Sequence, residues 1–266
     1  AALVERLLDH PNIRLLAEHS AEEAAYDNES RQWLVRTPHG TLSGSHIVFC
    51  TGAGSLHAPV TQQFPLQIIR GQTSIAPATE YSRALKTALS AASYISPAWQ
   101  GRHCFGATFA PNNPDTAWQA EDERHNRQAL SQLNEPLYRS LSAQWGDESS
   151  LHPAERGHAA QRCDAHDHLP AVGALGDAAA MKQVYAKFAH DKNYPIHTPC
   201  PYLPNAYLNT AHGSRGLATA PLCAADIAAQ ICRTPRLLSA RLQQALNPNR
   251  LIIKEIIHGK IGAKVR

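Results

Sequence analysis

The sequence predicts a mixed α/β and α+β fold, in which two α/β-like ends flank a middle part rich in strands. An apolar strand, a glycine turn and an alanine-rich helix follow one another over residues 207–231. A second apolar run, at residues 46–51, enters another glycine turn. Between these places, alternating apolar segments indicate strands. We therefore expect a middle domain inserted into an α/β domain whose two pieces lie far apart in the sequence.

The composition is that of a soluble globular protein. Of the 266 residues, 43% are hydrophobic and 18% are charged, a balance that favours a folded chain over a disordered one. The net charge of +3 permits contact with nucleic acid without requiring it. No apolar run approaches the roughly 20 residues that span a bilayer.

The cysteines favour a reducing, cytoplasmic location. The six cysteines are scattered and include no Cys-x-x-Cys pair, which argues against a disulfide scaffold. Cys163, His166 and His168 lie close in sequence, but they lack the second pair of ligands that a closed zinc site requires. No metal site is therefore predicted.

The first 64 residues are predicted to hold one helix end and several strands. The helix carries Leu3, Leu7 and Leu8 on one face and stops at Pro11. Polar turns then divide four strand-like runs, at residues 13–17, 24–27, 33–37 and 41–50.

The middle of the chain combines strands with one long helix. Residues 117–145 have an amphipathic pattern that is interrupted near Pro136. Strands are predicted at residues 66–75, 94–97, 103–107 and 155–163. The first of them contains Arg70-Gly-Gln72, a charge and a glycine that a plain core strand would avoid. Four prolines indicate that residues 174–204 are irregular.

The stretch after residue 206 carries the most specific local signal. Residues 207–210 are predicted as a buried strand, residues 212–216 as a sharp turn and residues 217–231 as a helix. The apolar face of that helix consists of Leu217, Leu222, Ile227 and Ile231. The first N–H groups of a helix lack internal partners and favour negative charge, and Gly213 and Gly216 would let the backbone approach a ligand closely. An ordinary strand-to-helix turn with no ligand stays open as the alternative.

Three arginines accompany the glycine-bearing turns. The apolar run at residues 46–51 enters Gly52-Ala-Gly54, where an α/β sheet lets a cofactor lie against its carboxyl edge; a tight packing turn is the alternative. Arg70, Arg162 and Arg215 could each hold a carboxylate in bidentate fashion, or each could form a structural ion pair. Together these features fit a flavin enzyme that acts on an amino-acid-like group.

Several segments together carry a family resemblance. They are Cys50-Thr-Gly-Ala-Gly54, Arg70-Gly-Gln72, Arg162 with Asp167-His-Leu-Pro-Ala-Val-Gly173, Gly213-Ser-Arg-Gly-Leu217, and Ala245-Leu-Asn-Pro-Asn-Arg250. With these segments the chain resembles the amino-acid-oxidase-like flavoproteins. More closely, it is similar to the FAD-dependent oxidoreductase domain of the bifunctional tRNA 5-methylaminomethyl-2-thiouridine biosynthesis proteins. The resemblance covers nearly the whole chain.

The resemblance implies a fold and a reaction. The fold would be an incomplete Rossmann-type FAD-binding domain at residues 1–64 and 205–250, an inserted antiparallel-sheet substrate domain at residues 65–204, and a basic segment at residues 251–266. The reaction would be FAD-dependent removal of the carboxymethyl group from 5-carboxymethylaminomethyl(-2-thio)uridine at the tRNA wobble position. The products would be the aminomethyl nucleoside and glyoxylate. In the complete family protein a separate methyltransferase domain then methylates the amine.

The resemblance also implies roles for single residues. The cofactor contacts would be Gly52, Ala53, Gly54, Gly213, Ser214, Arg215, Gly216 and Leu217. Backbone N–H groups of the second glycine turn would lie near the pyrimidine edge of the flavin. Arg162 would grip the substrate carboxylate, and Arg70 and Arg215 are further candidates. No protein base is required, because a neutral amine can transfer hydride directly.

The sequence departs from the family pattern at one point. It contains no Gly-x-Gly-x-x-Gly loop, the element that binds the FAD pyrophosphate. We therefore expect the chain to be truncated within the flavin domain and to bind FAD weakly or not at all. Two other interpretations stay open, a non-catalytic remnant that still touches tRNA and a generic oxidase of glycine-like amines. The Asn247-Pro-Asn-Arg250 segment and the basic residues after it favour tRNA over a free amino acid.

Overall fold

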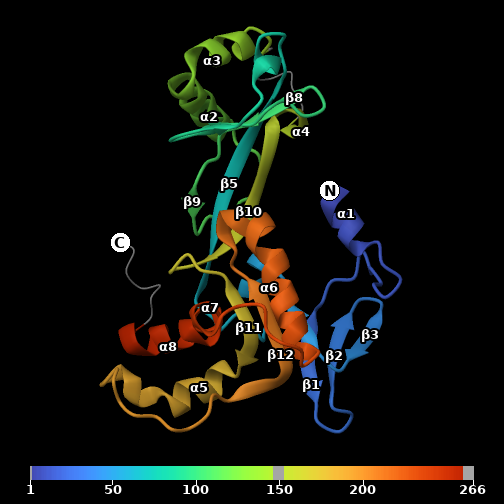
Figure 1. Cartoon of the computed structure of the whole chain (residues 1–266), viewed down its shortest axis with the longest axis vertical. Helices are drawn as coiled ribbons and strands as arrows, with labels where there is room; N and C mark the ends of the chain where they lie inside the picture. The colour runs from blue at the N-terminus through green and yellow to red at the C-terminus, as the bar shows by residue number, and fades with distance from the viewer. Residues whose placement is uncertain (1, 146–152, 260–266) are drawn as a thin grey trace.

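The computed structural model describes residues 2–145 and 153–259, and it consists of two bodies joined by a narrow waist (Figure 1). The lower body contains the three-stranded sheet β11-β12-β4, the small sheet β1-β2-β3 and helix α6. The upper body contains α2 and α3 packed on β8. The waist consists of the long strands β5 and β10, with β9 beside β5.

The sheet of the lower body positions both glycine turns. β4 (Ile47–Phe49) is parallel to β12 (Tyr202–Thr210), and β11 (Ala171–Gly176) is antiparallel to β12 on its other side. Side chains alternate along β12, so that Tyr207 packs with α6 (Gly216–Ile231) while its neighbours face the larger core. Both faces of the sheet are therefore covered, as the strong apolar character of β12 requires.

The remaining elements of the lower body surround this sheet. α5 and α8 contribute to the larger core through Met181, Leu251 and Ile252. The small meander adds Trp33, whose indole Nε1 donates to the carbonyl of Pro204 at 2.7 Å. The bounds are α1 (Ala2–Leu8), β1 (Glu23–Asp27), β2 (Gln32–Thr37), β3 (Gly40–Gly44), α5 (Ala178–Val184), α7 (Ala240–Leu246) and α8 (Asn249–His258).

The upper body has its own apolar core. Ala76, Ile95 and Phe105 of the sheet pack against Leu130 and the leucines of α3. The helical region is broken at Asn134, which caps α3 by accepting from the N–H of Leu137 at 2.9 Å. The bounds are β6 (Leu89–Ser90), β7 (Tyr94–Ile95), β8 (Arg102–Phe105), β9 (Ala110–Pro111), α2 (Ala120–Leu133), α3 (Glu135–Ser142) and α4 (Pro153–Arg156).

The two bodies share one strand. β5 (Leu66–Pro77) begins in the lower core with Leu66 and reaches the upper core with Ala76. β10 (Gly157–Ala165) is antiparallel to it over nine residue pairs, from Gly157 opposite Ser74 to Ala165 opposite Leu66. This ribbon carries both Arg70 and Arg162 at the level of the waist.

Several element predictions are confirmed and others are wrong. The helix at residues 2–8, the break in the long helix and the strand-turn-helix ending at Ile231 are all present. The predicted strand at residues 13–17 is wrong, because this segment is irregular. Residues 41–50 form two strands, β3 and β4, instead of one, because the chain turns between Gly44 and Ile47.

The predicted irregular excursion is confirmed for residues 190–201, which hold three of the four prolines and no helix or strand, and it is wrong for the rest of the segment. Residues 174–204 contain the end of β11, all of α5 and the start of β12. Asp177 caps α5 by accepting from the N–H of Ala180 at 3.0 Å, whereas the four prolines behind the prediction all lie after α5, at residues 195–204. Because β11 pairs with β12, residues 171–176 lie in the lower sheet, although the predicted boundary at residue 204 assigns them to the substrate domain. The division into domains stays a prediction.

Two further expectations concern the C-terminal third. The predicted apolar face of α6 is half wrong, because Ile227 is buried whereas Leu217 is 81% exposed and Leu222 is also exposed. The predicted basic segment at residues 251–266 begins as helix α8, whose Leu251 and Ile252 are buried. Its last basic residues, Lys260, Lys264 and Arg266, lie outside the described residues.

Candidate functional site

The two glycine turns meet at one edge of the lower sheet. Because β4 and β12 are parallel, their carboxyl ends lie side by side. β4 leads into the short 3₁₀ helix η1 (Gly52–Leu56), and β12 leads into η4 (Gly213–Arg215). Ser55 connects the two. Its hydroxyl oxygen lies 2.8 Å from the hydroxyl oxygen of Thr51, and it donates a longer hydrogen bond of 3.5 Å to the hydroxyl of Thr210. The predicted juxtaposition of the two turns is therefore present.

A small cavity of about 180 Å³ opens between β10 and the second glycine turn. Its lining includes two of the three predicted arginines, Arg162 and Arg215, and the glycine turn itself. The complete set of lining residues is Phe109, Arg162, Asp164, His168, His212, Gly213, Ser214 and Arg215. The structure thus brings Arg162 and the glycine-arginine bend together, as the sequence led us to expect, while their roles in catalysis stay predictions.

Arg162 has unused hydrogen-bond donors. Within the part of the chain that the structure describes, its guanidinium has no hydrogen bond and no ion pair, and its Nε is buried without a partner. Its one ring contact places the guanidinium carbon 5.2 Å from the centre of the Phe109 ring. A cation with free, forked N–H groups at a cavity is suited to bidentate binding of a carboxylate.

Asp164 lies two residues after Arg162 and lines the same cavity, but its charge is engaged locally. One carboxylate oxygen accepts from the N–H of Ala165 at 2.9 Å, and the other lies 3.1 Å from Nδ1 of His168. His168 has a left-handed φ of +56°, which points to a tightly specified backbone at this place. Asp164 and His168 therefore place polar groups beside Arg162, but Asp164 forms no ion pair with it.

The second glycine turn is fixed by a neutral histidine. His212 contacts Thr219 of α6 through Nδ1 at 2.8 Å and Asn209 of β12 through Nε2 at 3.0 Å. Burial lowers the pKa of His212 below its ordinary value, so the ring is uncharged at neutral pH. Gly213 has a φ of +55°, a conformation that favours glycine, and no side chain caps the N-terminus of α6. The first backbone N–H groups of α6 are thus left without a side-chain partner.

These features fit part of a flavin cofactor. Gly52 has a φ of +52°, and a Cβ built on it would meet no atom within 4 Å, so the first turn is open to a close-lying ligand. Leu217 exposes an apolar side chain at the start of α6. A flavin is a planar ring with polar edges. Such a ring requires open backbone beside it, free N–H groups at its polar edge and apolar surface against its face, and this sheet edge offers all three.

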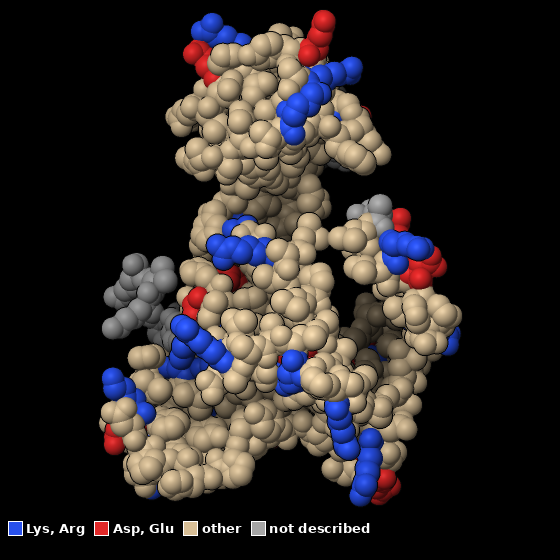
Figure 2. Space-filling view, viewed as in Figure 1, with Lys and Arg blue, Asp and Glu red and all other residues tan. Residues whose placement is uncertain are grey.

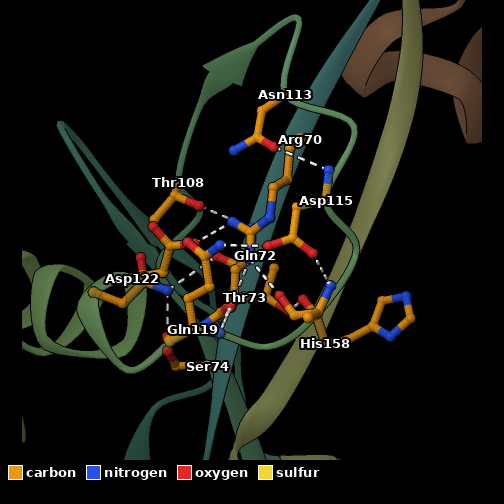
Figure 3. Close-up of polar contacts among 12 residues, drawn as sticks. Arg70, Gln72, Thr73, Ser74, Thr108, Asn113, Asp115, Gln119, Asp122 and His158 are labelled. Atoms are coloured by element: carbon orange, nitrogen blue, oxygen red, sulfur yellow. Dashed lines mark hydrogen bonds and ion pairs between the residues drawn. The ribbon is translucent and has the colours of Figure 1, made fainter.

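Arg70 lies outside this cavity. Its guanidinium is buried, with 1% exposure, and it forms an ion pair with Asp122 (Figure 3). The same side chain donates to the carbonyl of Ala117 at 2.7 Å and to the side chain of Gln72 at 3.1 Å. Arg70 therefore forms the structural ion pair that the sequence analysis left open. Protein groups bind its Nη1 and Nη2, while its Nε is buried without a partner.

Two of the segments that carry the resemblance contact each other. Arg250 donates through Nε and Nη2 to the two carboxylate oxygens of Asp167, each at 2.9 Å, and Lys254 adds a contact at 2.7 Å. Asn249 holds the edge of β11, since its side chain accepts from Gly176 N at 2.7 Å. These side chains anchor α8 to the lower body.

Four lining residues were missed by the sequence analysis. Asp164 could have been found, because alternate residues of a strand share one face and Arg162 is two positions away. His168 was noted only within an incomplete metal pattern, and His212 only as the start of a predicted turn, so neither was assigned to the site. Phe109 comes from a segment far away in the sequence and carried no local signal.

The chain was compared with known families and proteins. A family model described as FAD dependent oxidoreductase matches residues 2–230. The chain belongs to this family. Its members depend on FAD, the cofactor expected from the glycine turns. Among the described residues no helix is long and apolar enough to cross a membrane, and no group of three or more metal-ligating side chains is found.

The relatives in sequence are longer proteins. The chain is 36% identical over 261 residues to the tRNA 5-methylaminomethyl-2-thiouridine biosynthesis bifunctional protein of Chromobacterium violaceum, which covers 98% of this chain and 39% of that protein. It is 35% identical over 260 residues to the protein of the same name from Pseudomonas putida, with 97% and 39% covered. The chain thus spans about two fifths of the length of these relatives.

The fold is shared with solved structures of a glycine oxidase and an L-proline dehydrogenase. Glycine oxidase from Geobacillus kaustophilus aligns with a TM-score of 0.66 and 15% identity, over 90% of this chain and 54% of that one. L-proline dehydrogenase from P. horikoshii aligns with a TM-score of 0.61 and 14% identity, over 90% and 55%. The predicted amino-acid-oxidase-like fold is therefore confirmed.

Proposed function

We propose that this chain is the oxidoreductase part of a tRNA-modifying enzyme. It removes the carboxymethyl group from 5-carboxymethylaminomethyl(-2-thio)uridine at the wobble position of tRNA. The names of the sequence relatives and the FAD-dependent family support this reaction. The single observation that carries it is the unpaired guanidinium of Arg162 in a cavity beside the glycine-arginine bend.

The substrate has a secondary amine that bears a CH₂–COO⁻ group. Arg162 binds the carboxylate through two N–H groups, and Arg215 adds positive charge at the rim of the cavity. FAD supplies the two-electron oxidation of the C–N bond. Water then adds to the oxidised carbon, and the C–N bond breaks to leave the aminomethyl nucleoside and glyoxylate. The residues of the chain orient the arm, and the neutral His212 keeps the bend in place.

The size of the cavity also supports a second candidate. A volume of about 180 Å³ holds the carboxymethylamino arm and leaves the uracil ring at the rim. A free glycine-like amine would fit the same volume, so a generic amino-acid oxidase is the alternative. tRNA binding distinguishes the two candidates. Figure 2 shows Lys and Arg side chains scattered over this face of the lower body, with some Asp and Glu side chains among them. Binding of tRNA through such groups weakens steeply as salt rises.

The carboxylate site can be tested without turnover. We expect Arg162→Lys to weaken binding of methoxyacetate, an oxygen analogue of the substrate arm that cannot be oxidised in the same way, by about 10-fold to 100-fold. The reason is that one ammonium group cannot reproduce two charge-assisted hydrogen bonds. Isothermal titration of the full chain measures the Kd. Arg139→Lys, in an exposed pair with Glu135, is the matched control. Unchanged binding by Arg162→Lys would remove this residue from the proposed site.

The reaction itself is tested in a second experiment. The chain, supplied with FAD, is incubated with tRNA that carries the carboxymethylaminomethyl group. The tRNA is then digested, and the nucleosides are identified by liquid chromatography and mass spectrometry. We expect the aminomethyl nucleoside and one glyoxylate for each group lost. Oxidation of free N-methylglycine with untouched tRNA would instead support the generic oxidase. The flavin absorbance of the purified chain, read before FAD is added, tests the expectation of weak FAD binding.

A further inference from the structure

We infer that Phe109 is a positioning residue for Arg162, and that the segment of residues 106–119 is clamped to β5 in order to present it. This inference rests on the proposed function, because it concerns the carboxylate site assigned there. Phe109 lies far from Arg162 in sequence and would hold the Arg162 guanidinium in place. Arg70, whose charge does not reach the cavity, would help to hold the segment that carries Phe109.

Phe109 combines exposure with one specific contact. The residue is 58% exposed, although a phenylalanine in a folded chain is usually buried. Its ring lies under the guanidinium of Arg162, at 5.2 Å from the ring centre to the guanidinium carbon. Among the described residues, the Phe109 ring is the one group with which the Arg162 side chain makes a polar or ring contact. An aromatic face under a guanidinium attracts the cation and leaves the N–H edge free.

The backbone on both sides of Phe109 is fixed to β5. Thr108 donates its N–H to the carbonyl of Gln72 at 3.1 Å, and its hydroxyl accepts from the N–H of Gln72 at 2.9 Å. Ala110 is paired with Arg70 in the β5–β9 ladder. Gly71 lies between these two anchors, and a Cβ there would approach the Thr108 carbonyl oxygen to 3.0 Å. The segment therefore lies so close to β5 that a side chain at position 71 would be crowded against it.

The end of the same segment is held by a buried polar network (Figure 3). The Gln72 side chain accepts from Gln119 N at 2.7 Å and donates to the Gln119 carbonyl at 2.8 Å. Arg70 binds the Ala117 carbonyl at 2.7 Å and forms the ion pair with Asp122 at the start of α2. Arg70 and Gln72 thus fix both ends of the stretch that carries Phe109, at a depth where unpaired groups would be costly.

The arrangement has a consequence for binding. An arginine side chain without protein partners samples many rotamers, and ordering it on ligand binding costs free energy. The Phe109 ring holds the guanidinium before the ligand arrives. It also shields one face of the arginine–carboxylate pair from water, which strengthens the charge interaction. Loss of the ring should therefore weaken carboxylate binding while leaving the fold intact.

The test uses the full chain and methoxyacetate as the probe. We expect Phe109→Leu to raise the Kd about tenfold and Phe109→Tyr, which keeps the aromatic face, to stay within about twofold of the unchanged protein. Tyr81→Leu is the matched control, because Tyr81 is an aromatic residue with the same 58% exposure in the upper body. The ¹H–¹⁵N resonance of Arg162 Nε gives a second measurement. It should move in Phe109→Leu and stay in place in Tyr81→Leu.

The outcomes separate this inference from the proposed function. If the unchanged protein does not bind methoxyacetate, or Arg162→Lys binds it equally well, both ideas fail. If Arg162→Lys loses binding but Phe109→Leu keeps it, or Tyr is no better than Leu at position 109, only the role of Phe109 fails. For the clamp we expect Asp122→Asn to raise the Kd about threefold, with a melting temperature that shows a folded protein. An unchanged Kd in that variant would overturn the clamp.

Discussion

At the scale of single residues, the groups around an arginine decide what it can do. Arg70 and Arg162 lie on neighbouring strands of the same ribbon, with Arg70 opposite Gln161 and Arg162 opposite Ile69. Arg70 has a carboxylate partner in Asp122, whereas Arg162 has a phenylalanine ring. A paired guanidinium holds protein segments together, and an unpaired one beside a cavity can bind a ligand. Residue type alone does not distinguish the two cases.

A residue-scale prediction concerns Asp167. Burial by itself would raise its pKa, but hydrogen bonds from Arg250 and Lys254 outweigh burial and hold the pKa well below its usual range. We expect Asp167→Asn to lower the free energy of unfolding by about 2 kcal/mol, because two charge-assisted contacts to α8 are lost. Since the folded pKa is depressed, this stabilisation is present above the unfolded pKa of about 4 and is lost as the pH falls through the folded pKa.

The pH dependence supplies the check on Asp167. Urea unfolding of both proteins, followed from pH 7 down to pH 3, should give a constant difference above about pH 5 that shrinks at lower pH. Glu135→Gln, at an exposed pair on α3, should show almost no difference at any pH. A difference between wild type and Asp167→Asn that is as large at pH 3 as at pH 7 would show that the charge of Asp167 is not the cause.

At the scale of elements, α6 is held at its end by a buried carboxylate. Asp226 has a 1% exposed side chain, and it accepts from the N–H groups of Leu237 and Leu238 at 2.9 and 3.0 Å. Arg236 adds an ion pair to its other oxygen. This one side chain therefore shapes the turn that leads from α6 to α7.

We predict that Asp226→Asn destabilises the protein by about 2–3 kcal/mol. The amide has a single acceptor oxygen, and its NH₂ group replaces the other oxygen, so buried donors on that side are left without an acceptor. Thermal unfolding followed by circular dichroism measures the fall in melting temperature. Asp9→Asn, at an exposed pair with Arg6, should change stability by less than about 1 kcal/mol. Equal effects of the two changes would contradict a special role for Asp226.

The elements also show what the sequence can reveal. The strand-turn-helix around Gly213 was predictable, because its apolar period and glycines are local. α5 was missed because prolines at residues 195–204 indicated that the whole stretch was irregular, although Asp177 is a recognisable cap. The exposure of Leu217 was not predictable, since apolar spacing alone does not show which part of a face is covered. The contact of Phe109 with Arg162 depends on residues far apart in the chain, as does the Asp167–Arg250 pair.

At the scale of the whole molecule, the candidate site lies where the two bodies meet. Arg162 and Asp164 come from the ribbon, Gly213 and His212 from the lower body, and Phe109 from the segment that leads to α2. The sequence indicated a sheet-rich middle between two α/β ends, a division that stays a prediction, and Figure 1 shows two bodies joined by a waist. The assignment of β11 to the lower sheet depends on its pairing with β12, which no local pattern showed.

β5 belongs to both hydrophobic cores, since Leu66 packs in one and Ala76 in the other. Separate cores usually melt as separate cooperative units. Here, melting of either core would remove the strand on which the other is built. We therefore expect a single heat-absorption peak in scanning calorimetry, with a calorimetric enthalpy equal to the van 't Hoff enthalpy. Two resolved peaks would mean that the shared strand does not couple the cores, and a single one would make the molecule, despite its waist, one thermodynamic unit.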